Sequence, residues 1–276
     1  MKKTLRYNFL LVMMVLPLCT FAGWPIGKYR NLVVPSFNYY TAKNTFDTQG
    51  KKVNGVAGSG FDSYGFNIFF ARGLSRRLDL IVSVPFVYQT NRSGGVTNNS
   101  SGATDLTAGL SYLILNNHYE RFLSAQLSAI APLYSNKNTS SALGYGSYGS
   151  EAKISFSGNI AKHFIKGAYF NTEIYYRRYF NQDGPNQYGA YVFFGYLLSK
   201  SNQVTLDAVA IKSVSDNKSF NQNITSIKDF SLIKPSLSFG HRFNRRLSMF
   251  VGGYYTVAGR NTAIGYGTNV SAIFHL

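Results

Sequence analysis

Alternation of large and small side chains over residues 64–88, blurred only in places such as Ile81 and Val87, limits what this chain can fold into. Every second residue of the first half is large and apolar, namely Tyr64, Phe66, Ile68 and Phe70. After a short basic turn at residues 74–77, the alternation resumes with Leu78, Leu80, Val82, Val84, Phe86 and Tyr88. Because successive side chains of a strand point to opposite faces, this stretch predicts a β-hairpin with one apolar face.

Similar segments of about ten residues recur from residue 31 to the end of the chain, and we count about twelve of them. Long polar connections follow the odd-numbered segments, and short turns follow the even-numbered ones. This arrangement is typical of a barrel with outer loops and periplasmic turns. We therefore predict an all-β fold, a transmembrane up-and-down antiparallel β-barrel of about 12 strands formed by residues 23–276.

Four prolines fall inside the predicted strands: Pro35, Pro85, Pro132 and Pro235. Each one lacks the N–H group that a strand donates to its neighbour, and a closed barrel has no free edge to accommodate it. We therefore expect β-bulges or positions at the barrel rim there.

The N-terminus has the pattern of a secretory signal peptide, which we assign to residues 1–22. Lys2, Lys3 and Arg6 precede an apolar run, and Ala22 ends a plausible cleavage site. The only cysteine, Cys19, lies inside this signal, and Leu18 stands where a lipoprotein signal needs a small residue. We therefore expect an exported chain without thiols and without a lipid on Cys19.

Positive charge dominates the chain, with a formal net charge of +17 at pH 7. Such an excess can indicate nucleic-acid binding, but an exported aromatic β-protein does not meet nucleic acid. The expected partner is instead the phosphate-rich lipid of the Gram-negative outer membrane, including lipopolysaccharide. The basic loop residues that could hold its phosphates are Lys51, Lys52, Arg92, Lys137 and Lys218.

Three short motifs resemble the MetA-pathway phenol-degradation family. They are the residues Gly73-Leu74-Ser75-Arg76-Arg77-Leu78-Asp79-Leu80, then Val82-Ser83-Val84-Pro85-Phe86-Val87, then Gly102-Ala103-Thr104-Asp105-Leu106 with Gly109 and Tyr112. The resemblance implies an outer-membrane β-barrel that transports aromatic or hydrophobic compounds.

Charged residues on the polar faces of the predicted strands are the candidate pore-lining residues. They are Asp79, Asp105, Glu151, Lys153, Glu173, Arg177, Lys234 and Arg242. A basic side chain facing lipid at the bilayer midplane would cost roughly 2 to 4 kcal/mol, so these groups should face the lumen. They could select solutes in a polar pore, or they could brace the wall as an ion-pair network, and both roles can hold together.

Two aromatic stretches, Tyr175-Tyr176-Arg177-Arg178-Tyr179-Phe180 and Tyr39-Tyr40, could bind an aromatic ligand by stacking and cation–π contact. An aromatic girdle at the membrane interface is the interpretation that we favour.

Catalysis is not expected from this sequence. The four histidines, His118, His163, His241 and His275, all fall at the predicted periplasmic end, and no Gly-x-Ser-x-Gly motif is present. We expect no cofactor and no metal, since no His/Asp/Glu cluster has ligand spacing.

The expected function is passive passage of small molecules through the outer membrane. The resemblance favours hydrophobic or aromatic solutes, whereas the charged lumen favours polar ones. The alternative is a structural or surface-interaction barrel that binds lipid or host components through its outer loops without transport.

Overall fold

The computed structural model describes residues 24–136, 142–160, 166–218 and 227–276. The predicted signal peptide, with Cys19, lies outside the described residues. The strands are β1 (Asn31–Phe46), β2 (Lys52–Val53), β3 (Gly60–Gly73), β4 (Leu78–Ser93), β5 (Val96–Ala103), β6 (Asp105–Asn117), β7 (Arg121–Pro132), β8 (Gly149–Asn159), β9 (Ala168–Tyr179), β10 (Asn186–Leu197), β11 (Asn202–Val214), β12 (Phe230–Arg242), β13 (Leu247–Tyr255), β14 (Ala258–Arg260) and β15 (Thr262–His275). No helix among the described residues is long and apolar enough to span a membrane.

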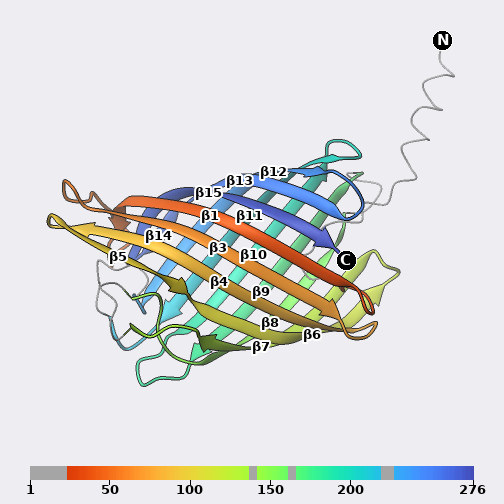
Figure 1. Ribbon diagram of the computed structural model, residues 1–276, viewed down its shortest axis with the longest axis horizontal. Helices are drawn as coiled ribbons and strands as arrows, with labels where there is room; N and C mark the ends of the chain where they lie inside the picture. The colour runs from red at the N-terminus through yellow and green to blue at the C-terminus, as the bar shows by residue number, and fades with distance from the viewer. Residues whose placement is uncertain (1–23, 137–141, 161–165, 219–226) are drawn as a thin grey trace, which may run out of the picture.

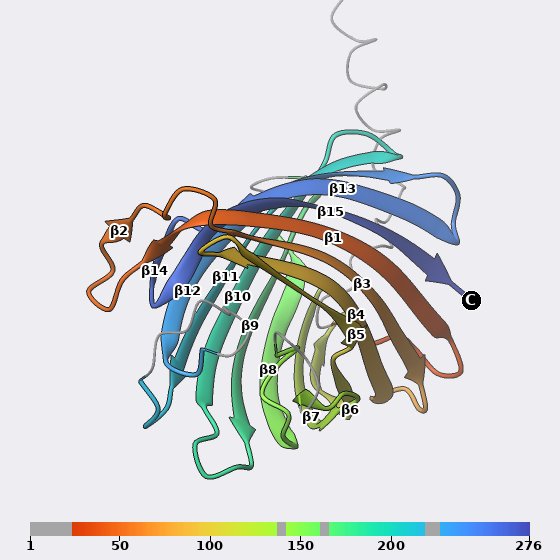
Figure 2. The ribbon, with the colours of Figure 1, turned by 60° about the vertical axis from the view of Figure 1, so that its left-hand side comes forward.

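Twelve of these strands close into an antiparallel barrel, as the sequence predicted (Figures 1 and 2). Each strand pairs with its predecessor around the ring, and β1 closes the ring by pairing with β15. The short strands β2, β5 and β14 pair with β1, β4 and β12, respectively, at the end opposite the C-terminus (Figures 1 and 2). Closure pairs the backbone groups that an open sheet edge would leave unsatisfied in lipid, where each would cost several kcal/mol.

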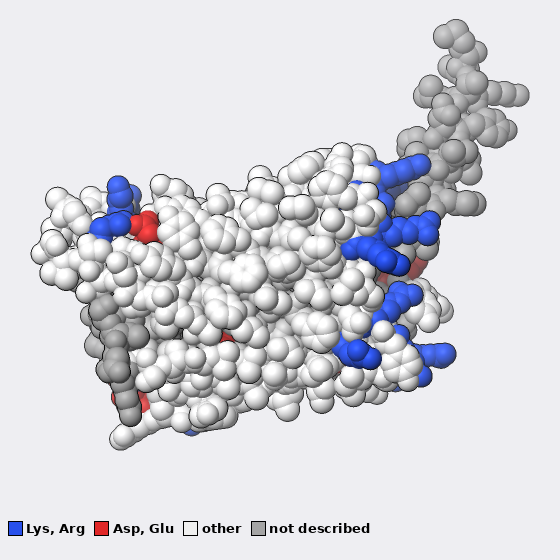
Figure 3. All heavy atoms as spheres, viewed as in Figure 1, with Lys and Arg blue, Asp and Glu red and all other residues white. Residues whose placement is uncertain are grey.

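The outer face of the barrel is a continuous apolar surface. Figure 3 shows a wide middle belt that is almost free of charged side chains. Large side chains at alternate positions, such as Phe66, Leu127 and Ile174, are exposed on it. Tyrosine rings gather near its outer edge, with Tyr64 lying 5.1 Å from Tyr39 and 6.3 Å from Tyr88 between ring centroids. This pattern matches the belt and aromatic girdle of a barrel in the outer membrane.

The barrel wall begins at Asn31 and finishes at Leu276, and these two residues are neighbours at the same end of the barrel. The amide of Asn31 donates to the carbonyl of Leu276, and the amide of Leu276 donates back to Asn31, both at 3.0 Å. The short turns lie at this end and the long connections at the other, so this end faces the periplasm. The two termini were expected on one side, and the structure confirms it.

Basic side chains are concentrated at the periplasmic end (Figure 3). Eleven lie on or beside its turns: Lys28, Arg30, Arg72, Arg76, Arg77, Arg121, Lys166, Lys200, Arg242, Arg245 and Arg246. Only Asp79 and Glu120 accompany them among the described acidic residues of this end. Most of the positive charge of the barrel therefore faces the periplasm.

The prolines lie where the strand ladder is interrupted or ends. Pro132 is the last residue of β7, a rim position as predicted. Pro85 lies where the partner of β4 changes from β6 to β5, and Pro235 lies where the partner of β12 changes from β14 to β13. Pro35 falls in a gap of the ladder between β1 and β15. At Pro85 and Pro235 the missing donor is tolerated because the partner strand changes there, and at Pro35 because the ladder with β15 has a gap, not because the proline forms a bulge.

Candidate functional site: the barrel lumen

Four charged side chains form a network on the inner face of β8 and β9. Glu151 lies directly opposite Arg177 in the strand register. Arg177 donates to Oε2 of Glu151 through Nε at 3.0 Å and through Nη2 at 2.6 Å. Lys153 Nζ lies 3.0 Å from Glu173 Oε2 and 3.9 Å from Glu151 Oε1. Two acids and two bases balance, so this part of the wall is polar but neutral.

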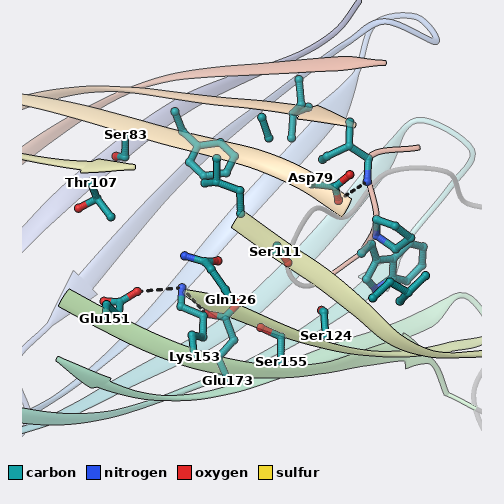
Figure 4. Close-up of a pocket in the computed structure, with 18 of the residues that line it drawn as sticks. Asp79, Ser83, Thr107, Ser111, Ser124, Gln126, Glu151, Lys153, Ser155 and Glu173 are labelled. Atoms are coloured by element: carbon teal, nitrogen blue, oxygen red, sulfur yellow. Dashed lines mark hydrogen bonds and ion pairs between the residues drawn. The ribbon is translucent and has the colours of Figure 1, made fainter. Parts of the chain in front are cut away.

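A cavity of about 320 Å³ lies beside this network inside the barrel (Figure 4). Polar side chains from four strands face it: Ser83, Thr107, Ser111, Gln126 and Ser155. Apolar side chains complete the lining, among them Leu32, Phe69 and Ile81. The lumen at this level is therefore amphipathic and of the size that commonly binds a small organic molecule.

The residues that precede β1 line the periplasmic side of the cavity. The amide of Ile26 donates to Oδ2 of Asp79 at 3.0 Å. The ring of Trp24 lies 5.4 Å from the buried ring of Phe122. Trp24, Pro25 and Ile26 therefore lie against the cavity.

A second charged group lies on the wall formed by β11, β12 and β13. Lys234 Nζ lies 4.5 Å above the ring of Tyr254, which stacks on Tyr40 with centroids 6.2 Å apart. Asp207 shares this inner face, because its neighbours Leu206 and Ala208 occupy the outward positions of β11. Sequence reasoning missed Asp207, although the same alternation could have identified it.

Several aromatic rings line the lumen, not only the outer girdle. Tyr169 and Phe193 lie 5.7 Å apart, and Tyr175 stacks near Arg177, whose guanidinium carbon is 5.7 Å from the ring centroid. Tyr175 lies flat over Gly189 of the next strand, where a Cβ atom would come within 2.0 Å of the ring. Glycine therefore lets the ring lie along the wall instead of projecting across the lumen. Aromatic residues therefore lie on the inner wall of the barrel as well as in the predicted girdle.

The described residues of the connection between β7 and β8, 133–136 and 142–148, lie at the outer mouth. Tyr145 donates to the carbonyl of Ile227 at 2.9 Å, and burial raises the pKa of Tyr145 to about 12. Burial also raises the pKa of Tyr134, whose hydroxyl accepts a hydrogen bond from the amide of Gly146 at 2.9 Å. Asp105 lies beneath this loop and accepts a hydrogen bond from the Tyr179 hydroxyl at 3.0 Å. These tyrosines act as neutral hydrogen-bonding groups at physiological pH.

Comparison with known proteins identifies the family. The family described as "Putative MetA-pathway of phenol degradation" matches residues 42–271. The chain belongs to this family. No curated protein shows significant sequence similarity to the chain.

Solved structures of outer-membrane barrels share its fold. The COG4313 outer membrane channel from Pseudomonas putida F1 superposes with a TM-score of 0.75 at 13% identity, covering 95% of this chain and 100% of that one. The β domain of the Bordetella autotransporter BrkA gives a TM-score of 0.56 at 11% identity, covering 90% and 100%. The NanC porin gives 0.53 at 9% identity, covering 87% and 98%. Fold and family together place this MetA-pathway family member in the outer membrane.

The eight predicted pore residues lie at three depths of the barrel. Glu151, Lys153, Glu173 and Arg177 form the network described above, and Lys234 lies on the other wall. Asp105 lies under the outer loop, and Asp79 lies near the periplasmic end. Arg242 lies at the periplasmic rim, where it donates to the carbonyl of Lys200. Their role in lining a pore remains a prediction.

The described histidines lie where the sequence placed them. His118, His241 and His275 are at the periplasmic end, and His163 lies outside the described residues. His241 Nδ1 lies 2.7 Å from the Asn202 side-chain oxygen. Within the described ranges, no group of three His, Cys, Asp or Glu side chains could hold a metal ion.

Proposed function

We propose that this barrel is a passive channel for small molecules across the outer membrane. The observation that carries the proposal is the cavity of about 320 Å³ inside a closed barrel, lined by both ion pairs and apolar side chains. If the charged residues only stabilised the wall, the lumen would be expected to be filled with packed side chains, as it is in small barrels. The space left beside Lys153 and Glu173 instead matches a small solute.

The solutes that we propose are small aromatic compounds carrying a polar or charged group. The rings of Trp24 and Phe69 line the cavity together with Lys153 and Arg177. Elsewhere on the inner wall, Arg177 and Lys234 lie beside the rings of Tyr175 and Tyr254. Aromatic rings next to cations suit a planar aromatic ligand that carries an anionic group or a hydroxyl group on its ring. This combination reconciles the hydrophobic solutes implied by the family with the charges of the lumen.

The second candidate function is a surface-interaction barrel without transport. It is favoured by the segments that cover both mouths, Trp24 to Ile26 on the periplasmic side and the loop carrying Tyr145 on the outer side. In that function the outer rim would contact lipopolysaccharide, which we also propose as the outer-leaflet partner of the channel. Its contacts would involve basic loop residues such as Lys51 and Lys52, which are exposed.

Conductance and solute uptake distinguish the two functions. The purified protein is reconstituted into planar bilayers and into liposomes, and swelling is compared for benzoate, 4-hydroxybenzoate and uncharged sugars. Thr107→Trp fills the cavity, whereas Ala108→Trp, one residue further along β6, faces lipid and serves as the matched control. We expect T107W to lower conductance several-fold and A108W to leave it unchanged. A wild-type barrel that passes neither ions nor solutes would exclude the channel.

A further inference from the structure

A groove on the outer wall of the barrel crosses β10, β11, β12 and β14. Its volume is about 440 Å³, and its lining includes Tyr188, Ala210, Lys212, Ser231 and Ile233. Tyr188 is 54% exposed and Ile233 is 45% exposed, so the groove opens on the lipid-facing side and not into the lumen. The groove therefore faces the molecules of the membrane itself.

The strand register divides the outward residues of the groove into two rows. Tyr188, Lys212 and Ser231 are paired across β10, β11 and β12 and form a polar row, which Arg260 of β14 continues just outside the groove. Ala190, Ala210, Ile233 and Ala258 form a second, apolar row two residues nearer the midplane. Two residues along a strand span about 7 Å, so the two rows are roughly one headgroup apart in depth.

The polar row lies at the outer interface of the membrane. Tyr188 belongs to the outer girdle, since its ring lies 5.3 Å from Tyr176, whose hydroxyl donates to Asn186 at 2.7 Å. Tyrosines of this kind lie at headgroup level in transmembrane barrels. The long connection between β11 and β12 begins just beyond Lys212, which confirms that this is the outer end.

Two cations of this surface are available to an anion. Lys212 and Arg178 are exposed, and neither forms an ion pair with a carboxylate in the part of the chain that the structure describes. Two other bases near the outer end are already paired, because Arg92 pairs with Asp62 and Lys218 lies 3.7 Å from Asp229. Arg260 at the end of the row is likewise held by Asp229, at 2.9 Å. Lys212 is therefore the central cation of the groove, with Arg178 one strand beyond Tyr188.

We propose that this groove binds lipopolysaccharide, with Lys212 contacting a lipid A phosphate and one acyl chain packing against the apolar row. The anionic phosphate meets the basic residue at headgroup depth, and the small side chains of Ala190 and Ala210 leave room for the chain below it. Ser231 and Tyr188 offer hydroxyl groups to the sugar. The site lies outside the lumen and deepens the proposed lipid partnership; the channel proposal does not depend on it.

Lipid A binding to the purified full-length barrel in detergent tests the proposal. The titrants are bisphosphorylated lipid A, the same lipid without phosphates, and phosphatidylglycerol. Lys212→Gln removes the cation and should weaken binding of bisphosphorylated lipid A about fivefold, as expected for one basic residue near a lipid surface. Ala210→Phe fills the groove and should weaken binding of both lipid A forms. Arg245→Gln, in a periplasmic turn, is the matched control and should bind like wild type.

Three results would overturn the assignment. Wild-type affinity in both K212Q and A210F would show that lipid A binds elsewhere. Equal affinity for the dephosphorylated lipid would exclude phosphate recognition, and equal affinity for phosphatidylglycerol would exclude lipopolysaccharide as the specific occupant. If A210F does not fold, as judged by circular dichroism, then K212Q and the dephosphorylated lipid decide the question. Conductance is measured on the same variants, so a loss of lipid binding with unchanged conductance separates this site from the channel.

Discussion

Replacement of Arg177 by glutamine tests whether the lumen network stabilises the barrel. Arg177 makes two hydrogen bonds to Glu151, at 3.0 and 2.6 Å. The Glu151 side chain is only 5% exposed, so the variant leaves a carboxylate in the wall with no guanidinium to pair with it. Lys153 remains at 3.9 Å and offers only a weak substitute.

The expected loss in the free energy of unfolding is about 3 kcal/mol. Removing one partner of a buried ion pair costs roughly 3 to 5 kcal/mol, because the other charge stays buried and unpaired. The lower value applies here because Arg177 is 31% exposed to the lumen and Lys153 is still near Glu151. Replacing Glu151 by glutamine as well removes the unpaired charge, so the double variant should be more stable than R177Q by about 2 kcal/mol.

Urea unfolding of the barrel in lipid vesicles measures these differences. Arg178→Gln is the matched control, since Arg178 follows on the same strand, faces outward and is exposed. Its change should stay within about 0.5 kcal/mol. If R177Q costs no more than R178Q, or if the double variant shows no recovery, the network does not brace the wall.

Two further predictions concern the ends of the barrel. Trp24 is the only tryptophan and lines the cavity, so its fluorescence should be quenched by soluble acrylamide but not by brominated lipid. Trp24→Ala should raise conductance. Quenching by brominated lipid would show that Trp24 does not lie in the lumen. At the outer end, the hydrogen bond from Arg260 holds the pKa of Asp229 below its usual value of about 3.9. This pair joins the residue before β12 to β14, so it stabilises this corner of the barrel above about pH 4, and the stabilisation is lost as the pH falls through the lowered pKa. In urea unfolding, Asp229→Asn should therefore be less stable than wild type near neutral pH and similar to it once the pH has fallen below the lowered pKa, with Asp216→Asn behaving like wild type. Equal stability of all three proteins near neutral pH would refute the role of the pair.

The sequence determined the barrel because period-two alternation is a local property of each strand. Tyr64 to Tyr88 alone specifies a strand pair with one apolar face, and lipid on one side with water on the other leaves a closed ring as the stable arrangement. The strand number, the side on which the termini lie and the inward position of Glu151 and Arg177 follow from the same pattern.

Only the tertiary structure decided what the lumen contains. Periodicity says that Arg177 and Glu151 face inward, but their pairing depends on the register between β8 and β9, which alternation does not fix. The entry of Trp24 against Phe122 and the reach of Tyr145 to Ile227 join segments far apart in the sequence and without regular pattern. The position of Pro235 is explained by the break between β13 and β14, a feature of the neighbouring strand and not of its own. Such contacts arise from closure of the ring, which brings distant residues together across a shared interior.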